Sequence, residues 1–238
     1  MLVSGGKSIY GARIGILMLE AQFPRIPGDM GNAETWPFPV LYKVVRGATP
    51  DRVVRKNAEG TLNKFIAAAE ELVSAGADAV TTNCGFLSIF QKELSAAVRV
   101  PVLTSSLMQV NTVNMLLPES KKAGILTISK STLSDAHLTA ANVPSDTPIG
   151  TTEDGAEFSN VILNDELQLN IELAKMDNIN AALKMKADHS NLGAIILECT
   201  NMCPYAKDIQ EAVGLPVFSI VNFVQWLHAG LKPTRFLS

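Results

Sequence analysis

Two cysteines, Cys84 and Cys199, stand at matching places in this sequence, within the stretches 82–85 (TNCG) and 198–201 (ECTN). A thiolate accepts a proton and a neutral thiol gives one up. Two thiols that face one carbon atom can therefore remove its proton on one side and return a proton on the other. Such chemistry inverts a carbon next to a carboxylate without a cofactor. Both cysteines are candidate catalytic residues, and we expect no cofactor.

The cysteines belong to a repeat without gaps. Cys199 minus Cys84 is 115, and Pro216 minus Pro101 is also 115. A single cysteine at a strand end is usually a packed core residue. Packing gives no reason for the same residue at the same turn twice, so the repeat favours a reactive pair. The same shift places identical residues on one another at five further positions: Ala79 on Ala194, Lys92 on Lys207, Ala97 on Ala212, Val98 on Val213 and Val102 on Val217.

The third cysteine, Cys203, lacks a counterpart, because Ser88 stands at the matching place in the first half. We expect Cys203 to be structural. Cys199 and Cys203 do not have the two-residue gap of common zinc sites, and no histidine or second cysteine pair completes a ligand set. We therefore expect no metal.

The elements around the cysteines indicate how they are positioned. Each cysteine follows an apolar run typical of a buried strand, 79–82 or 194–197, and precedes a helical pattern and a short strand that begins at proline. Strands that alternate with helices predict an α/β fold of two pseudo-symmetric lobes, each a parallel sheet flanked by helices, with the active site in the cleft between them.

We assign residues 1–110 to the first lobe, 111–220 to the second, and 221–238 to a C-terminal helix and tail that return to the first lobe. Further strands are expected over 13–19, 40–45, 101–103 and 123–128, and a polar loop over 142–155. Helices are expected over 62–75 with a cap at Gly76, and over 87–98, 106–117, 129–141, 159–188 with an internal break, and 222–228.

Ligands of open parallel sheets bind at the carboxyl ends of the strands, where both cysteine turns lie. Each turn also stands at the start of a helix, where free N–H groups and the macrodipole favour an anion. We expect this position to lower the thiol pKa from roughly 8.5 towards neutrality. The same N–H groups, at Gly85 and Asn201, are expected to hold the substrate carboxylate and the charge that develops on it.

Composition excludes several classes of function. The formal net charge is -3 and no Lys/Arg cluster stands out, so we expect no nucleic-acid partner. No apolar run approaches the roughly 20 residues of a membrane span, so we expect no membrane partner. Three cysteines in a sequence without a secretory signal indicate reduced thiols and a cytoplasmic protein.

The segment 20–39 is rich in proline and glycine and is the expected specificity element. Arg25 is suited to pair with a second carboxylate through two hydrogen bonds, and Asp29 to hold an ammonium group. The alternative is that both are solvated loop charges.

The cysteine motifs resemble those of the aspartate/glutamate racemase superfamily, which also contains hydantoin racemases, maleate isomerases and arylmalonate decarboxylases. The resemblance covers nearly the whole chain, and the second motif, 199–201 (CTN) followed by Pro204, is close to the Cys-Thr-His and Cys-Thr-Glu forms. The resemblance implies a homo-oligomer. It also implies that a substrate carboxylate is contacted by Asn83, Ser129, Thr132 and Thr200, with Glu20 as the counterpart of an acidic residue after the first strand.

The departures from the family pattern affect the substrate. Asn201 stands where glutamate racemases have a histidine, and Phe86 replaces a polar group. Arylmalonate decarboxylases resemble single-thiol members, whereas this chain has both thiols. We therefore predict a cofactor-independent racemase or epimerase, an isomerase of the PLP-independent amino-acid racemase type. It would invert the alpha carbon of a small carboxylate by proton transfer between Cys84 and Cys199.

Two alternatives remain open. One is a decarboxylase or cis-trans isomerase on the same scaffold, like arylmalonate decarboxylase or maleate isomerase. The other is a two-lobed protein that binds a small ligand without chemistry.

Overall fold

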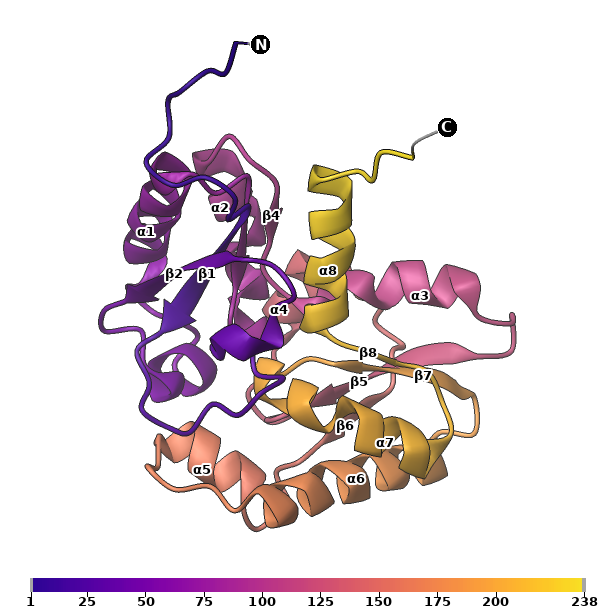
Figure 1. Cartoon of the computed structure of the whole chain (residues 1–238). Helices are drawn as coiled ribbons and strands as arrows, with labels where there is room; N and C mark the ends of the chain where they lie inside the picture. Colours follow the sequence, from indigo (N-terminus) through magenta and orange to yellow (C-terminus); the bar gives the residue numbers. More distant parts are fainter. Residues whose placement is uncertain (1, 237–238) are drawn as a thin grey trace.

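The apolar runs of the sequence form two four-stranded parallel sheets in a computed structural model that describes residues 2–236 (Figure 1). The strand orders are equivalent, β2-β1-β3-β4 and β6-β5-β7-β8, and helices flank each sheet. The expected α/β class with two similar parallel sheets is confirmed. The strands are β1 (Ile14–Leu19), β2 (Val40–Val45), β3 (Ala79–Thr82), β4 (Val102–Leu103), β5 (Lys122–Thr127), β6 (Ile149–Thr151), β7 (Leu192–Leu197) and β8 (Val217–Phe218).

Helices and short helical turns connect the strands. The α-helices are α1 (Leu62–Ala75), α2 (Gln91–Ala97), α3 (Val110–Leu116), α4 (Asp135–Ala140), α5 (Phe158–Asn164), α6 (Ile171–Asp188), α7 (Ala206–Val213) and α8 (Ile220–Leu231). The 3-10 turns are η1 (Ala33–Thr35), η3 (Gly85–Phe90), η4 (Ser106–Gln109) and η5 (Thr200–Tyr205), and η2 (Asp51–Arg55) is a π-helical turn.

The repeat in the sequence is also a repeat in hydrogen bonding. The Val80 N–H donates to the Pro101 carbonyl at 2.9 Å, and the Ile195 N–H donates to the Pro216 carbonyl at 2.9 Å. Both pairs are related by the same shift of 115 residues that relates the cysteines. The strands that carry the two cysteines are therefore held in the same register in both sheets.

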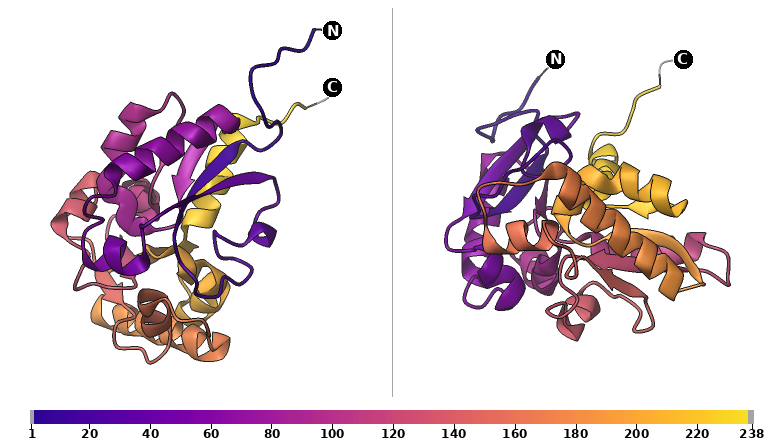
Figure 2. Two further views of the ribbon diagram at one scale, coloured as in Figure 1. Left: turned by 90° about the vertical axis from the view of Figure 1, so that its left-hand side faces the viewer. Right: turned by 90° about the horizontal axis from the view of Figure 1, so that it is seen from below.

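The C-terminal helix α8 packs on the first sheet. Ile220 and Val224 are fully buried together with Ile14 and Ile16 of β1. Figure 1 shows α8 beside the first sheet, and Figure 2 shows that the N-terminal segment and the segment after α8 leave the same end of the molecule. The last two residues of the expected C-terminal tail, 237–238, lie outside the described residues.

Three elements differ from expectation. The region 142–155 contains β6, which pairs in parallel with β5 at the sheet edge. The helix expected over 129–141 covers only Asp135–Ala140, because a capping box at Ser134 starts it late. The helix after Cys84 begins as a 3-10 turn and becomes α-helical only at Gln91. The expected break within 159–188 falls between α5 and α6.

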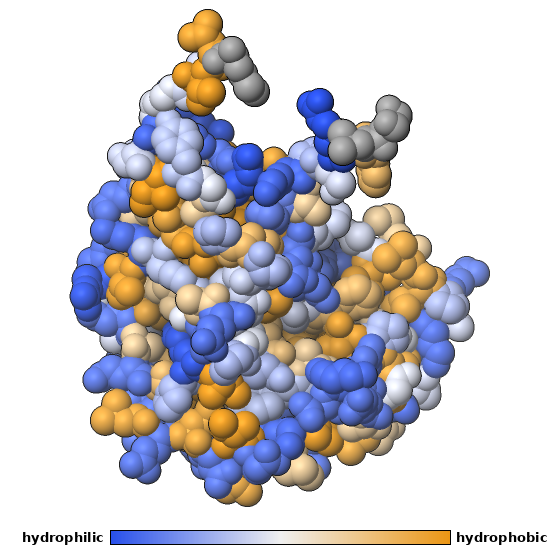
Figure 3. All heavy atoms as spheres, viewed as in Figure 1, coloured by the Kyte–Doolittle hydropathy of each residue, from blue (hydrophilic) through white to orange (hydrophobic). Residues whose placement is uncertain are grey.

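Exposed apolar side chains gather between α3 and α8. Met115 and Leu116 on α3 and Trp226 on α8 are 78%, 74% and 69% exposed, and an apolar area is visible at this side of the molecule (Figure 3). Within residues 2–236, no helix combines the length and the apolar character that crossing a bilayer requires.

Candidate active site

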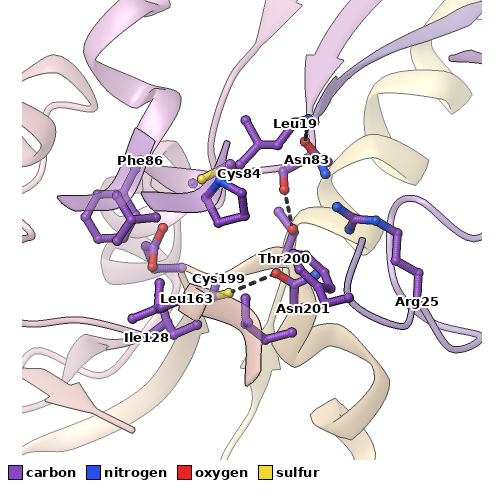
Figure 4. Close-up of a pocket in the computed structure, with 16 residues that line it drawn as sticks. Leu19, Arg25, Asn83, Cys84, Phe86, Ile128, Leu163, Cys199, Thr200 and Asn201 are labelled. Carbon is purple, nitrogen blue, oxygen red and sulfur yellow. Dashed lines mark hydrogen bonds between the residues drawn. The ribbon is translucent and has the colours of Figure 1, made fainter. Parts of the chain in front are cut away.

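Both cysteines line one pocket between the two sheets (Figure 4). The remaining lining is mostly apolar, with one guanidinium and one carboxyl group. Its volume is about 20 Å³, room for little more than a water molecule. The other lining residues are Leu19, Phe23, Arg25, Pro50, Val54, Asn83, Gly85, Phe86, Ile128, Ile162, Leu163, Glu198, Thr200 and Asn201.

The strand ends place the two cysteines. Each cysteine follows a residue that continues a sheet ladder: the Asn83 N–H donates to the Leu17 carbonyl at 3.0 Å, and the Glu198 N–H to the Leu126 carbonyl at 2.9 Å. Cys84 and Cys199 then cap η3 and η5, and Figure 4 shows their side chains on opposite walls of the pocket.

The two cysteine turns contact each other across the lobes. The Thr200 hydroxyl donates to the Asn83 carbonyl at 2.6 Å. A Cβ atom at Gly85 would lie 2.3 Å from both the carbonyl oxygen and Oε1 of Glu198, so only glycine fits at this position. The hydroxyl of Ser106 also donates to the Leu197 carbonyl at 2.6 Å. These contacts fix the distance between the turns.

Burial controls the acid–base state of the thiols. It raises the pKa of Cys84 to about 12, with the Glu198 charge as a further cause, and outweighs the Phe86 N–H that lowers this pKa. Burial and the Glu198 charge also raise the pKa of Cys199 well above its ordinary value. The expectation of thiol pKa values near neutrality is therefore wrong, because desolvation exceeds the effect of N–H groups at a short 3-10 turn.

A chain of polar contacts leads from Arg25 to Cys199. Nη1 of Arg25 donates to Oδ1 of Asp29 at 2.9 Å, and Nδ2 of Asn201 donates to Oδ2 of Asp29 at 2.5 Å. The Cys199 thiol donates to Oδ1 of Asn201 at 3.5 Å. Asp29 is buried and both its oxygens are engaged, so the expected role of Asp29 as an ammonium ligand is not supported.

Three of the expected substrate-binding residues lie outside the pocket. Glu20 accepts hydrogen bonds from Arg46 Nη1 at 2.7 Å and from the backbone after it, on the outer surface. The Ser129 hydroxyl donates to Glu153 at 2.8 Å, and the Thr132 hydroxyl donates to Ser129 at 2.8 Å. The Glu153 carboxylate thus engages the Ser129 hydroxyl, and Ser129 in turn engages the Thr132 hydroxyl, so both hydroxyls that the resemblance assigned to a substrate have partners within the chain. The other expected residues line the pocket: Arg25, Asn83, Cys84, Gly85, Cys199, Thr200 and Asn201.

Glu198 is a pocket residue that sequence reasoning missed as a candidate. Its side chain is wholly buried, and Oε2 accepts a hydrogen bond from the Thr127 hydroxyl at 2.8 Å. Burial raises the pKa of Glu198 to about 7. A signal was present in the sequence, because the shift of 115 residues places Glu198 on Asn83.

The fold is that of the aspartate/glutamate racemase superfamily, as expected. Similar solved structures include an arylmalonate decarboxylase, with a TM-score of 0.56, 14% identity and coverage of 93% of this chain and 94% of that chain. A glutamate racemase from Bacillus anthracis has a TM-score of 0.58 at 14% identity, over 93% of this chain and 83% of its own. The allantoin racemase of Pseudomonas fluorescens has a TM-score of 0.54 at 14% identity, over 95% and 100%.

The curated relatives in sequence carry a different activity in their names. A dimethylsulfoniopropionate lyase from Durusdinium sp. clade D is 27% identical over 90% of this chain and 73% of its own length. Dimethylsulfoniopropionate lyases 5 and 7 of Emiliania huxleyi are 23% and 25% identical, over 91% and 94% of this chain. The chain spans 45% and 68% of those two relatives. No protein-family model matches the chain.

These relatives overturn the predicted reaction. The sequence relatives are lyases, whereas the motifs had predicted an isomerase that inverts a carbon. The physical reason is that a fold and a pair of thiols do not by themselves specify one reaction, so the motifs could not separate an isomerase from a lyase. The proteins similar to this chain are enzymes.

Proposed function

We propose that this chain is a lyase that releases dimethyl sulfide from dimethylsulfoniopropionate or a close sulfonium carboxylate. The observation that carries the proposal is the pair of thiols that line one closed pocket beside Arg25, in a chain whose similarity to dimethylsulfoniopropionate lyases extends over 90% of its length.

The proposed reaction is an elimination. A cysteine thiolate takes the proton from the carbon next to the carboxylate, and the electron pair of that C–H bond forms a carbon–carbon double bond. The bond from the next carbon to sulfur breaks, and its electrons stay on sulfur. The products are dimethyl sulfide, acrylate and a protonated thiol, which returns its proton to solvent. The leaving group departs neutral, so it requires no acid.

Arg25 is the proposed ligand of the substrate carboxylate. Its Nη1 is held by Asp29, which leaves the other N–H groups of the guanidinium to bind a carboxylate. The guanidinium lies 4.4 Å from the centre of the Phe23 ring, which orients it at the edge of the pocket. A positive charge here stabilises the negative charge that develops on the carboxylate as the proton leaves.

An elimination needs one base, so the two thiols have different roles in this reaction. One thiol removes the proton, and the other lines the opposite face of the same carbon. Because burial keeps both thiols neutral at physiological pH, formation of the thiolate has to accompany substrate binding. A charged substrate changes the local charge around the thiols.

The experiment is a direct assay of purified protein with dimethylsulfoniopropionate. Dimethyl sulfide is measured by headspace gas chromatography and acrylate by NMR. We expect both products in equal amounts, with Cys84→Ser and Cys199→Ser each reducing turnover at least a hundredfold. Cys203→Ser is the matched control, since Cys203 does not line the pocket, and it should retain activity. The proposal is ruled out if the double variant of Cys84 and Cys199 releases dimethyl sulfide at the rate of the unaltered protein. It is also ruled out if the unaltered protein forms no product.

A further inference from the structure

Glu198 is a buried carboxyl group without an ionic partner. It is 0% exposed, and Oε1 has no hydrogen-bond partner among residues 2–236. No salt bridge within that range involves Glu198. Burying a carboxylate is costly unless a cation or several donors compensate it. A carboxyl left in this condition inside a pocket is suited to a ligand that brings the missing charge.

The carboxyl of Glu198 lies at the end of the pocket away from Arg25. The Thr127 hydroxyl and the Ile128 N–H face it, and Oε1 packs against Gly85. Figure 4 shows Ile128 and Phe86 on one side of the pocket and Arg25 on the other, with the cysteines between them. The charge of Arg25 is met by Asp29 at 2.9 Å and not by Glu198. The pocket therefore has a guanidinium paired with a carboxylate at one end and a carboxyl group without an ionic partner among residues 2–236 at the other.

We propose that Glu198 binds the positively charged sulfonium group of the substrate, so that this site selects zwitterions with an onium group on the carbon beyond the reacting one. This inference rests on the proposed function, which supplies the identity of the substrate and of the reaction. A sulfonium has no N–H or O–H to donate, so a negative charge and an aromatic face are the groups that recognise it. Glu198 supplies the charge, and the neighbouring Phe86 supplies the ring.

The repeat supports this assignment. Asn83 and Glu198 occupy the same position in the two lobes, directly before a cysteine. Nδ2 of Asn83 is also buried and has no hydrogen-bond partner within residues 2–236. The pocket is therefore not symmetric, because Asn83 offers a hydrogen-bond donor at one strand end and Glu198 offers an acceptor at the other. A substrate with opposite charges at its two ends has one orientation in such a pocket.

Cation binding at Glu198 would also activate the thiols. The negative charge of Glu198 is one cause of the raised pKa of both Cys84 and Cys199. An onium group beside Glu198 offsets that charge and favours the thiolate. The base therefore forms when the correct substrate is bound, and a neutral carboxylate does not produce it.

Calorimetric titration with two probes tests the recognition apart from turnover. The probes are 3-(trimethylammonio)propionate and its uncharged isostere 4,4-dimethylpentanoate. We expect the unaltered protein to bind the cation at least roughly tenfold more tightly, as for a desolvated charge pair. Glu198→Gln should abolish this preference and leave binding of the isostere unchanged. Glu20→Gln, which removes one negative charge outside the pocket, should keep the preference.

Proton exchange during the same titrations shows whether Glu198 is ionised or protonated when the ligand is bound. At neutral pH the cation should displace protons from Glu198, seen as a dependence of the heat on the ionisation enthalpy of the buffer. Glu198→Gln lacks this carboxyl group, so it should release fewer protons. Any release that remains comes from Cys84 and Cys199, the other titratable groups facing Glu198. Uptake of protons with the uncharged isostere would instead mean that protonated Glu198 donates to the substrate carboxylate, and would overturn the inference.

Failure of this inference is separable from failure of the proposed function. A preference for the cation that depends on Glu198, in a protein that releases no dimethyl sulfide, supports the recognition and refutes the lyase. Release of dimethyl sulfide with the same KM and the same cation preference in Glu198→Gln supports the lyase and refutes the recognition. Folding of the variant is checked by its thermal unfolding.

Discussion

At the scale of single residues, burial decides the chemistry of this site more than residue type does. Cys84 and Cys199 are 8% and 6% exposed, and both have a raised pKa because water is excluded from them. Glu198 is fully buried, and its pKa rises to about 7 for the same reason. Both thiols therefore hold their protons at neutral pH, whereas Glu198 changes its charge near that pH.

The free energy of unfolding should depend on Glu198. Its pKa rises from 4.5 to about 7 on folding, so between these values the native state binds more protons than the unfolded state. The contribution of Glu198 is fully present below pH 4.5 and is lost as the pH rises through 7, a total of about 3 kcal/mol at roughly 1.36 kcal/mol per unit. We expect Glu198→Gln to lack this loss.

Urea unfolding of the unaltered protein and of Glu198→Gln, at acidic and at mildly alkaline pH, measures the contribution of Glu198 to the free energy of unfolding. His137 acts in the opposite sense, because burial lowers its pKa to about 4, so the quantity to compare is the difference between the two proteins at each pH. That difference should move in favour of Glu198→Gln as the pH rises. A constant difference would show that Glu198 is ionised throughout.

At the scale of elements, the two cysteine turns depend on close contact between backbones. The Thr200 hydroxyl reaches the Asn83 carbonyl at 2.6 Å, and Gly85 lies directly against Glu198. Neither turn is complete alone, because each supplies a wall for the other. Backbone N–H groups early in each 3-10 turn face the cysteine that precedes it, those of Phe86 and Leu87 in η3 and that of Asn201 in η5.

Gly85→Ala should separate the turns. The new methyl would lie 2.3 Å from the carbonyl oxygen and from Oε1 of Glu198, so one turn must move. We expect at least a tenfold loss of turnover and a destabilisation of about 1–3 kcal/mol, typical of overpacking. Gly230→Ala is the matched control, because a methyl there meets nothing within 4 Å, and α8 should gain up to about 1 kcal/mol. Equal behaviour of the two variants would contradict this reading of Gly85.

At the scale of the whole molecule, contacts between the segment after β1 and the end of α5 join the two lobes next to the pocket. Backbone N–H groups of Gln22 and Phe23 donate to Oδ1 of Asp165 at 2.6 and 3.1 Å, and Arg55 donates to Asn164 at 3.1 Å. A volume of about 20 Å³ is too small for a substrate of several heavy atoms. We expect entry to require opening of these contacts between the segment after β1 and the end of α5.

Asp165→Gly should make the pocket more accessible. The variant removes the acceptor of two N–H groups, and glycine tolerates the φ of 57° at this position. We expect Cys84 and Cys199 to react several-fold faster with iodoacetamide, measured by mass spectrometry with Cys203 as internal reference. Asp154→Ala, which removes only the exposed ion pair with Lys184, should leave the rates unchanged. Unchanged rates in Asp165→Gly would mean that these contacts do not control entry.

The expectation of a homo-oligomer stays a proposal. The exposed apolar side chains of Met115, Leu116 and Trp226 between α3 and α8 are compatible with a second copy of the chain at this surface. Sedimentation velocity of the purified protein determines the mass in solution.

The sequence by itself determined the architecture and the central pair of the site. Strand and helix patterns are local. The repeat at a distance of 115 residues shows that Cys84 and Cys199 occupy the same position between a strand and a helix. Positions at strand ends converge in any parallel sheet, which placed Gly85 and Asn201 beside the cysteines, and the family resemblance added Asn83 and Thr200; all four line the pocket. The strand β6 was missed because its three residues lie within a polar, proline-containing segment.

The tertiary structure alone decided which groups are free to bind. Asp29 is occupied by Arg25 and Asn201, and Ser129 is occupied by Glu153. Several such contacts join residues far apart in the chain, as between Asn201 and Asp29, 172 positions apart. The burial of a side chain and its hydrogen-bond partners depend on the packing of the whole folded chain, so no local sequence pattern specifies them. The raised pKa values of the thiols and the unpaired Glu198 carboxyl follow from that packing.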